Sequence, residues 1–386
     1  MKIVNGNVFC EDNIFRKVNI QIEDEIISGI GEFPFSGDGI DNPSISVGSD
    51  ILDAEGCYVL PGLVEIHIHG AMGADFSDGD DYSIQTMAKF LLQKGITSFL
   101  GTSMALPEDR LLATYENAKS QINAEHTGRA VLRGINMEGP FFSQERRGAQ
   151  NEKYIINSDI DMFNRLNDAS GGNIKTVAVA PEIEGALDFI SFVHDISNIS
   201  IAHSDANYDV AMEAFSRGAN HVTHLFNGMS TFSPRAPGIP GAAADADAYV
   251  ELISDGVHLH PAVIRAVFKM FNNDRICLIS DGMRALGMPD GEYDLGDNAV
   301  TVKGNRATID SGSLAGSVTN LLDCFRHAVS FGIPIENAIK AATINPAKSV
   351  GLDDIVGSLK TGKRADIIIL DKNLELKHVI LGGEKQ

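Results

Sequence analysis

The sequence predicts an α/β fold, in which a (β/α)8 barrel is joined to a small β-sandwich built from both ends of the chain. Between residues 58 and 352, eight apolar stretches of strand length alternate with amphipathic helical segments, which is typical of parallel strands with helical crossovers. Residues 1–57 and 353–386 carry short β-type runs instead. We therefore expect 58–352 to form the barrel, and 1–57 and 353–386 to form the two parts of the sandwich.

The β-type runs near the N-terminus are short and bounded by polar residues. They cover Lys2 to Phe9, Val18 to Glu23 and Glu25 to Ile30, and the last two are separated by a polar turn at Asp24. This pattern predicts a small antiparallel sheet. Two further β-type runs, 366–370 and 378–381, are expected to pair with it.

Eight stretches between residues 64 and 280 are candidate barrel strands, and eight is the number that closes a barrel of this kind. They are Val64 to His69, Ile96 to Leu100, Val131 to Met137, Lys175 to Ala180, Ile199 to His203, His221 to His224, Val250 to Ser254 and Ile276 to Ser280. Helices are expected over 83–94 and 209–217, each followed by a glycine stop signal, and over 261–271. A Gly- and Asp-rich insertion, 287–309, looks like a hairpin before a helix at 318–330.

Composition places the chain in the ordinary globular range and excludes some partners. Its 386 residues are 44% hydrophobic and 22% charged, which allows a large core. Against 52 acidic residues stand 31 Lys and Arg, so the net charge of −21 gives no basic field for nucleic acid or an anionic membrane. No segment reaches the roughly 20 apolar residues that span a bilayer, and the four cysteines lie far apart, so we expect a cytoplasmic protein.

The most informative motif is His67-Ile68-His69, at the end of the first predicted barrel strand. Side chains alternate along a strand, so both rings project to the same side. Imidazole is a common metal ligand, and two rings on one rigid strand end form a chelating pair. The alternative reading is a polar, half-buried strand edge.

Four more potential ligands lie at the ends of other predicted strands, where the carboxyl ends of barrel strands converge on one mouth. They are Glu138, His203, His224 and Asp281. Either acid could instead cap a loop, but together the six side chains provide N and O donors for one or two divalent ions, of which zinc or iron fits best. Glu138 is the natural bridge between two ions. We expect His221, by contrast, to be a buried structural histidine.

Several longer motifs resemble those of the amidohydrolase superfamily, and within it the N-acetylglucosamine-6-phosphate deacetylases. The resemblance spans essentially the whole chain. The motifs that carry it are Pro61-Gly62-Leu63 before the His-x-His, Met137-Glu138-Gly139-Pro140-Phe141, Ala202-His203-Ser204-Asp205-Ala206, Thr223-His224-Leu225-Phe226-Asn227-Gly228-Met229, Asp255-Gly256-Val257-His258, Ser280-Asp281-Gly282-Met283, Leu314-Ala315-Gly316-Ser317 and Gly357 to Asp366.

The resemblance implies a metal-dependent amidohydrolase barrel that removes the acetyl group from N-acetylglucosamine 6-phosphate. It implies that Glu138, His203 and His224 hold the principal ion, that His67 and His69 allow a second, and that Asp281 is the general acid and base. The residues expected around the amino sugar phosphate are Ala149, Gln150, Asn227, Gly228, Arg235, Asp255, His258, Leu314, Ala315 and Gly316. A homodimer is also implied, with Arg235 reaching across the interface.

Two of these residues also carry a direct chemical argument. Arg235 lies in a Pro-rich loop, and a guanidinium matches phosphate geometry through two parallel hydrogen bonds; a solvated loop arginine is the alternative. Gln150 stands where many family members have histidine. Its amide can donate a hydrogen bond to a substrate carbonyl but cannot carry positive charge.

Other functions remain open at this point. The substrate could be the galactosamine epimer, or the reaction could be another of the superfamily, such as deamination or the opening of a cyclic amide. From a different class, a barrel without activity could serve as a scaffold, although such proteins tend to lose ligands and all six are present here.

Overall fold

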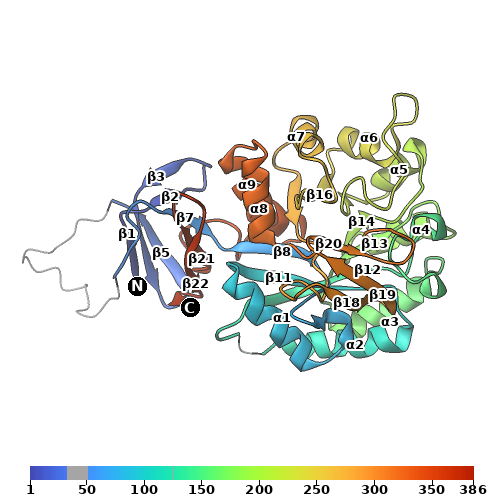
Figure 1. The fold of residues 1–386 in the computed structure, drawn as a ribbon, viewed down its shortest axis with the longest axis horizontal. Coiled ribbons are helices and arrows are strands. Elements are labelled where there is room, and N and C mark those ends of the chain that lie inside the picture. Colours follow the sequence, from blue (N-terminus) through green and yellow to red (C-terminus); the bar gives the residue numbers. More distant parts are fainter. Residues whose placement is uncertain (33–50, 125) are drawn as a thin grey trace, which may run out of the picture.

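A computed structural model describes residues 1–32, 51–124 and 126–386. It shows two parts: a nearly closed parallel barrel surrounded by helices, and two small sheets beside it (Figure 1). This is the fold that the sequence predicts. The boundaries at 57/58 and 352/353 stay a prediction, and residues 33–50 of the expected N-terminal part lie outside the described residues.

The barrel is a sheet of eight parallel strands in the order β17-β16-β15-β14-β13-β12-β11-β8. Each strand overlaps one of the eight predicted stretches. The strands are β8 (Leu63–Ile68), β11 (Ile96–Ser103), β12 (Val131–Glu138), β13 (Ile174–Val179), β14 (Asn198–Ile201), β15 (His221–Val222), β16 (Tyr249–Ile253) and β17 (Ile276–Ile279). β15 is shorter than expected because the backbone turns into the left-handed region at His224, where φ is 30°.

Helices follow the strands and cover the outside of the barrel (Figure 1). They are α1 (Asp81–Gln93), α2 (Glu108–Ile122), α3 (Ile160–Ser170), α4 (Ala186–Val193), α5 (Tyr208–Ser216), α6 (Gly238–Asp245), α7 (Pro261–Met270), α8 (Leu321–Ser330), α9 (Ile335–Ala342) and α10 (Ile344–Ser349). The predicted stop signals are confirmed, because Gly95 and Gly218 directly follow the residues that cap α1 and α5. Their φ angles of 75° and 112° lie in a region that residues with a side chain rarely adopt.

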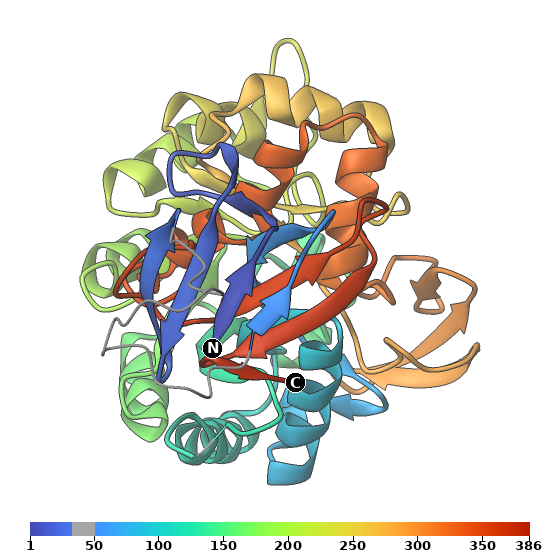
Figure 2. The same cartoon turned by 90° about the vertical axis from the view of Figure 1, so that its left-hand side faces the viewer.

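The two small sheets form one sandwich from both ends of the chain, as Figure 2 shows face-on. One sheet contains β1 (Lys2–Val4), β4 (Asn19–Glu23), β5 (Ile26–Gly31) and β6 (Ile51–Asp53). The other contains β2 (Asn7–Phe9), β3 (Phe15–Lys17), β7 (Tyr58–Pro61), β21 (Ile367–Leu370), β22 (Leu376–Leu381) and β23 (Glu384–Lys385). They share one apolar core, which includes Ile3, Val8, Ile20, Ile369 and Ile380.

The predicted run from Lys2 to Phe9 is two strands. Asn5 takes a left-handed backbone with φ of 61°, so the chain turns there, and β1 and β2 enter different sheets. The C-terminal strands join the same sheet as β2, but they do so through β7, which lies between β2 and β21.

The insertion at 287–309 is a hairpin extended by a third strand. Its strands are β18 (Gly291–Leu295), β19 (Asn298–Lys303) and β20 (Arg306–Thr308). Two short strands, β9 (Gly70–Ala71) and β10 (Ala74–Asp75), follow β8. Across the part of the chain that the structure describes, no helix combines the length and apolarity needed to cross a membrane.

The barrel closes between β8 and β17, where hydrogen bonds join the carboxyl ends of the strands. The backbone N–H of Asp281 donates to the His67 carbonyl at 3.0 Å, and that of His69 donates to the Gly282 carbonyl at 2.8 Å. Deeper in the seam, the buried carboxylate of Glu65 accepts from the N–H groups of His67 and Ser280, each at 3.0 Å. The Glu65 side chain therefore bridges β8 and the residue that follows β17.

We predict that Glu65→Ala destabilises the fold. The substitution leaves two buried N–H groups, those of His67 and Ser280, without their acceptor, and each such group costs about 1–3 kcal/mol. We expect the free energy of unfolding, measured by urea denaturation, to fall by about 2–4 kcal/mol. The exposed Glu55→Ala should change it by less than about 0.5 kcal/mol. Equal unfolding free energies for the two variants would contradict the bridging role.

Candidate active site

Six buried side chains meet at the carboxyl ends of the barrel strands. His67 lies on β8 and His69 directly after it, while Glu138 is the last residue of β12. The other three each lie two residues past a strand: His203 after β14, His224 after β15 and Asp281 after β17. The structure thus brings together all six residues that the sequence predicts as metal ligands.

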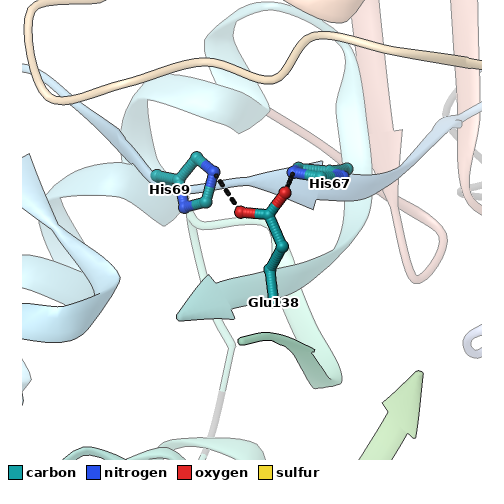
Figure 3. A group of neighbouring side chains, drawn as sticks. All are labelled: His67, His69 and Glu138. Carbon is teal, nitrogen blue, oxygen red and sulfur yellow. Dashed lines mark ion pairs between the residues drawn. The ribbon is translucent and has the colours of Figure 1, made fainter. Parts of the chain in front are cut away.

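One group of possible ligands contains His67, His69 and Glu138 (Figure 3). His67 Nε2 lies 3.6 Å from Glu138 Oε1, and His69 Nε2 lies 3.3 Å from Glu138 Oε2. Asp281 adjoins this group, because its Oδ1 lies 3.5 Å from His67 Nε2 and 3.3 Å from His69 Nε2. The two rings therefore face two carboxylates at once.

A second group contains Glu138, His203 and His224. Glu138 Oε1 lies 3.2 Å from His203 Nε2 and 3.1 Å from His224 Nε2, and the two nitrogens lie 3.2 Å apart. Ligands at about 2.0–2.1 Å from a tetrahedral zinc ion are separated from each other by about 3.3 Å. The three donor atoms thus have the spacing of ligands around one ion, and Glu138 belongs to both groups.

Hydrogen bonds on the far side of three rings fix how they point. His69 Nδ1 lies 3.2 Å from the Thr102 carbonyl and His203 Nδ1 lies 2.9 Å from the Arg146 carbonyl. A carbonyl only accepts, so each Nδ1 donates, and in the neutral ring Nε2 is then the atom that can offer a lone pair to a cation. His67 Nδ1 lies 2.9 Å from Glu251 Oε2, and its buried Nε2 has no hydrogen-bond partner among the described residues. Rings held in this way are typical of histidines that ligate a metal, so the residues fit one.

Three of the six residues have a strained backbone. His203, His224 and Asp281 have φ of 45°, 30° and 50°, in the left-handed region that residues with a side chain rarely adopt. Such a conformation costs about 1–3 kcal/mol and is found mostly at functional sites, where the surrounding structure enforces it. At these three positions the turn out of the strand is part of the site's geometry.

The buried acids and histidines of the site shift one another's pKa values. Burial by itself raises the pKa of Glu138, but the positive field of His67 and hydrogen bonds from His203 and His224 outweigh it and hold the pKa well below its usual range. Burial by itself lowers the pKa of His67, but the negative charges of Glu251 and Glu138 outweigh it and raise the pKa to about 9. The buried acids thus create a negative field at the histidine rings, which would also attract a cation.

Five of the six residues, all except His67, line a cavity of about 310 Å³ at the barrel mouth. Seven of the ten residues expected around a substrate line it: Ala149, Gln150, Asn227, Gly228, His258, Leu314 and Gly316. The other three are not among its lining residues in the described chain. Asp255 lies behind His258, whose Nδ1 is 2.7 Å from its Oδ2, Ala315 is buried, and Arg235 is exposed on its loop.

Gln150 is held by hydrogen bonds at both ends of its amide. Its Oε1 accepts from the backbone N–H of Ala105 at 2.8 Å, which fixes the amide orientation. Its Nε2 then donates to Glu138 Oε2 at 2.9 Å. One amide hydrogen therefore orients the shared carboxylate, and only the other is free for a ligand in the cavity.

Sequence reasoning missed several residues around the site. The cavity is also lined by Met104, Gly148, Phe226, Leu295 and Ser313. Phe226 carries a signal that could have been used, since it lies inside the motif that follows His224. Leu295 comes from the insertion at β18 and has no local signal. Glu251 is a lone acid within the apolar strand β16, which is a signal, but nothing in the sequence connects it with the histidines.

Comparison with known proteins agrees with this geometry. The amidohydrolase family matches residues 58–385. N-acetylglucosamine-6-phosphate deacetylase of Bacillus subtilis (strain 168) is 35% identical over 383 residues, covering 97% of each chain, and N-acetylgalactosamine-6-phosphate deacetylase of Escherichia coli O157:H7 is 31% identical, covering 95% of this chain and 93% of that one. A mutant N-acetyl-D-glucosamine-6-phosphate deacetylase from Mycobacterium smegmatis, solved in complex with N-acetyl-D-glucosamine-6-phosphate, is 29% identical, with a TM-score of 0.89 and coverage of 100% and 98%.

A parallel barrel whose carboxyl end gathers histidines and acids that could hold a metal ion is typical of metal-dependent barrel hydrolases. Within that class, the chain belongs to the amidohydrolase family, whose members are metal-dependent.

We predict that Glu138→Ala removes bound metal more completely than His69→Ala. Glu138 belongs to both groups of possible ligands, whereas His69 belongs to one. After equilibration with zinc and dialysis, we expect the zinc content by elemental analysis to fall to near zero for Glu138→Ala. His69→Ala should keep the zinc held by the second group. Zinc content at the wild-type level in Glu138→Ala would show that the shared carboxylate is not a ligand.

Proposed function

We propose that this protein is a metal-dependent hydrolase that converts N-acetylglucosamine 6-phosphate into glucosamine 6-phosphate and acetate. The observation that carries the proposal is the position of Asp281, an acid at the cavity rim within 3.3–3.5 Å of two histidine Nε2 atoms of a metal-binding group. The similarity to deacetylases of amino sugar phosphates supports this choice of substrate.

One or two divalent ions are proposed as the cofactor, with zinc or iron as the best match to the donors. Glu138, His203 and His224 would hold the principal ion, and His67 and His69 with Asp281 a second one. Imidazole and carboxylate suit these borderline metals better than magnesium or calcium, which prefer oxygen ligands alone.

The proposed reaction replaces the amide C–N bond by a C–O bond to water. A bound ion supplies Lewis acidity, which polarises the acetamide carbonyl and makes a water molecule more acidic. The Asp281 carboxylate takes a proton from that water as its oxygen attacks the carbonyl carbon. Asp281 then gives the proton to the amine nitrogen, because an amine leaves readily only when it is protonated. The second amide hydrogen of Gln150 is free to bind the carbonyl oxygen.

The sugar phosphate is proposed to occupy the cavity above the histidines. Asn227, Gly228, His258 and the loop of Leu314 and Gly316 line its walls. Arg235, which is exposed on its own subunit, would reach the phosphate of a neighbouring subunit in a homodimer. A cationic group is needed for this anion, because the chain as a whole carries a charge of −21.

The galactosamine epimer is a second candidate substrate. It is favoured by the 31% identity to the N-acetylgalactosamine-6-phosphate deacetylase of Escherichia coli over 95% of this chain. Acetate release from the two epimers, measured side by side with zinc-loaded and iron-loaded protein, decides between them.

We predict that Asp281→Asn abolishes most of the activity and spares the fold. An amide cannot take up and return the proton, so kcat for acetate release should fall by about 10²–10⁴-fold. Zinc content should be measured in parallel, because the group of Glu138, His203 and His224 does not need Asp281. The exposed Asp290→Asn in the following loop serves as a control. Turnover near the wild-type rate in Asp281→Asn with zinc retained would refute the assignment.

We predict that Arg235→Ala weakens the preference for a phosphorylated substrate. A charge-assisted pair of hydrogen bonds to phosphate contributes about 1.5–3 kcal/mol, so the ratio of kcat/KM for phosphorylated over unphosphorylated N-acetylglucosamine should fall by about 10–100-fold. Arg217→Ala, at the residue that caps α5 and pairs with Glu213, should leave the ratio unchanged. An unchanged ratio in Arg235→Ala would remove this residue from the phosphate site.

A further inference from the structure

Glu251 is a buried carboxylate in the middle of β16 that lies directly behind the histidine cluster. It belongs to neither group of possible metal ligands. Its Oε2 accepts two hydrogen bonds, from His67 Nδ1 at 2.9 Å and from the backbone N–H of His224 at 3.1 Å. One oxygen atom thus touches a member of each group.

The contact with His67 differs from those that hold the other rings. His69 and His203 donate from Nδ1 to neutral backbone carbonyls, whereas His67 donates to a carboxylate. A charged acceptor forms a stronger hydrogen bond and increases electron density on the ring, so Nε2 becomes a better donor to a cation. Glu251 therefore acts on His67 through both its orientation and its basicity.

The contact with His224 is made through its backbone and not through its ring. His224 Nδ1 has no hydrogen-bond partner in the described part of the chain, unlike Nδ1 of the other three rings. Its backbone has a φ of 30°, and the Glu251 side chain accepts from its N–H while the Glu251 carbonyl accepts from the next residue, Leu225, at 2.9 Å. Glu251 thus holds the strained turn from which the His224 ring projects.

The other oxygen of Glu251 faces a buried histidine on the opposite side. His221 Nε2 lies 3.4 Å from Glu251 Oε1, and Asn198 Nδ2 donates to His221 Nδ1 at 3.3 Å. His221 is fully buried and stacks on Tyr249, so its ring has little freedom to move. The histidine that the sequence marks as structural therefore borders the Glu251 carboxylate and limits the space into which it can move.

We infer that Glu251 is the positioning residue on which both candidate ion groups depend, through His67 in one and through His224 in the other. The inference rests on the proposed function, since it presupposes that these groups bind metal. It adds that one buried acid outside both groups sets the affinity of both.

The test is the zinc affinity of Glu251→Gln, measured by competition with a chromogenic chelator. Glutamine keeps the shape of the side chain and one acceptor oxygen but removes the charge. Loss of a residue that orients a metal ligand typically weakens metal binding by 10–100-fold, and we expect the zinc dissociation constant to rise by that factor. The visible absorption spectrum of the cobalt-loaded protein should also change, because the ligand geometry changes.

Two further variants separate this role from general destabilisation. Asp366→Asn replaces another buried acid, whose partners Arg133, Arg364 and Gly382 lie away from the site. It should leave the cobalt spectrum unchanged and the zinc dissociation constant within about threefold. Glu251→Asp keeps the charge but is one methylene shorter, so it cannot maintain both contacts and should also weaken zinc binding. If circular dichroism shows that Glu251→Gln does not fold, the zinc affinity of Glu251→Asp is compared with that of the wild type instead.

Failure of the inference and failure of the proposed function give different results. Wild-type protein that binds neither zinc nor cobalt would contradict the proposed function. Wild-type protein that binds zinc, with an unchanged dissociation constant and cobalt spectrum in folded Glu251→Gln or Glu251→Asp, would overturn only the role of Glu251.

Discussion

The hydrogen bonds that join the ends of β8 and β17 are the constraint on which the candidate site depends. They link residues more than two hundred positions apart and place His67 and His69 beside Asp281. The same seam holds the Glu65 bridge deeper in the barrel. Because the strands carry these side chains at their ends, the site keeps its geometry only while the barrel is closed at this point.

Hydrogen bonds to the candidate metal ligands fix how these side chains are oriented. Backbone carbonyls orient two rings, Glu251 orients a third and holds the backbone of the fourth, and Gln150 orients the shared carboxylate of Glu138. Left-handed backbone at three strand ends costs stability, which the surrounding packing offsets. The site is therefore preorganised by buried neighbours that need not touch a substrate.

Much of the fold and of the candidate site could be predicted from the sequence, because both depend on local patterns. Apolar strands followed by His or an acid mark the barrel mouth, so His67, Glu138 and Asp281 could be grouped before their positions were known. Glu251 could not, because it lies inside an apolar strand and its meaning depends on neighbours across the barrel. The division of 2–9 into two strands was missed although Asn-Gly at 5–6 signals a turn.

The sandwich has a consequence for how the chain acquires its structure during synthesis. Its core combines Ile3 and Ile20 with Ile369 and Ile380, so contacts of very high sequence separation complete it. On the ribosome, the first strands emerge long before the residues that complete their core, so part of their apolar surface lacks its native partners until the barrel is almost fully translated. Late assembly of this kind slows folding and leaves open strand edges exposed to aggregation or chaperone binding.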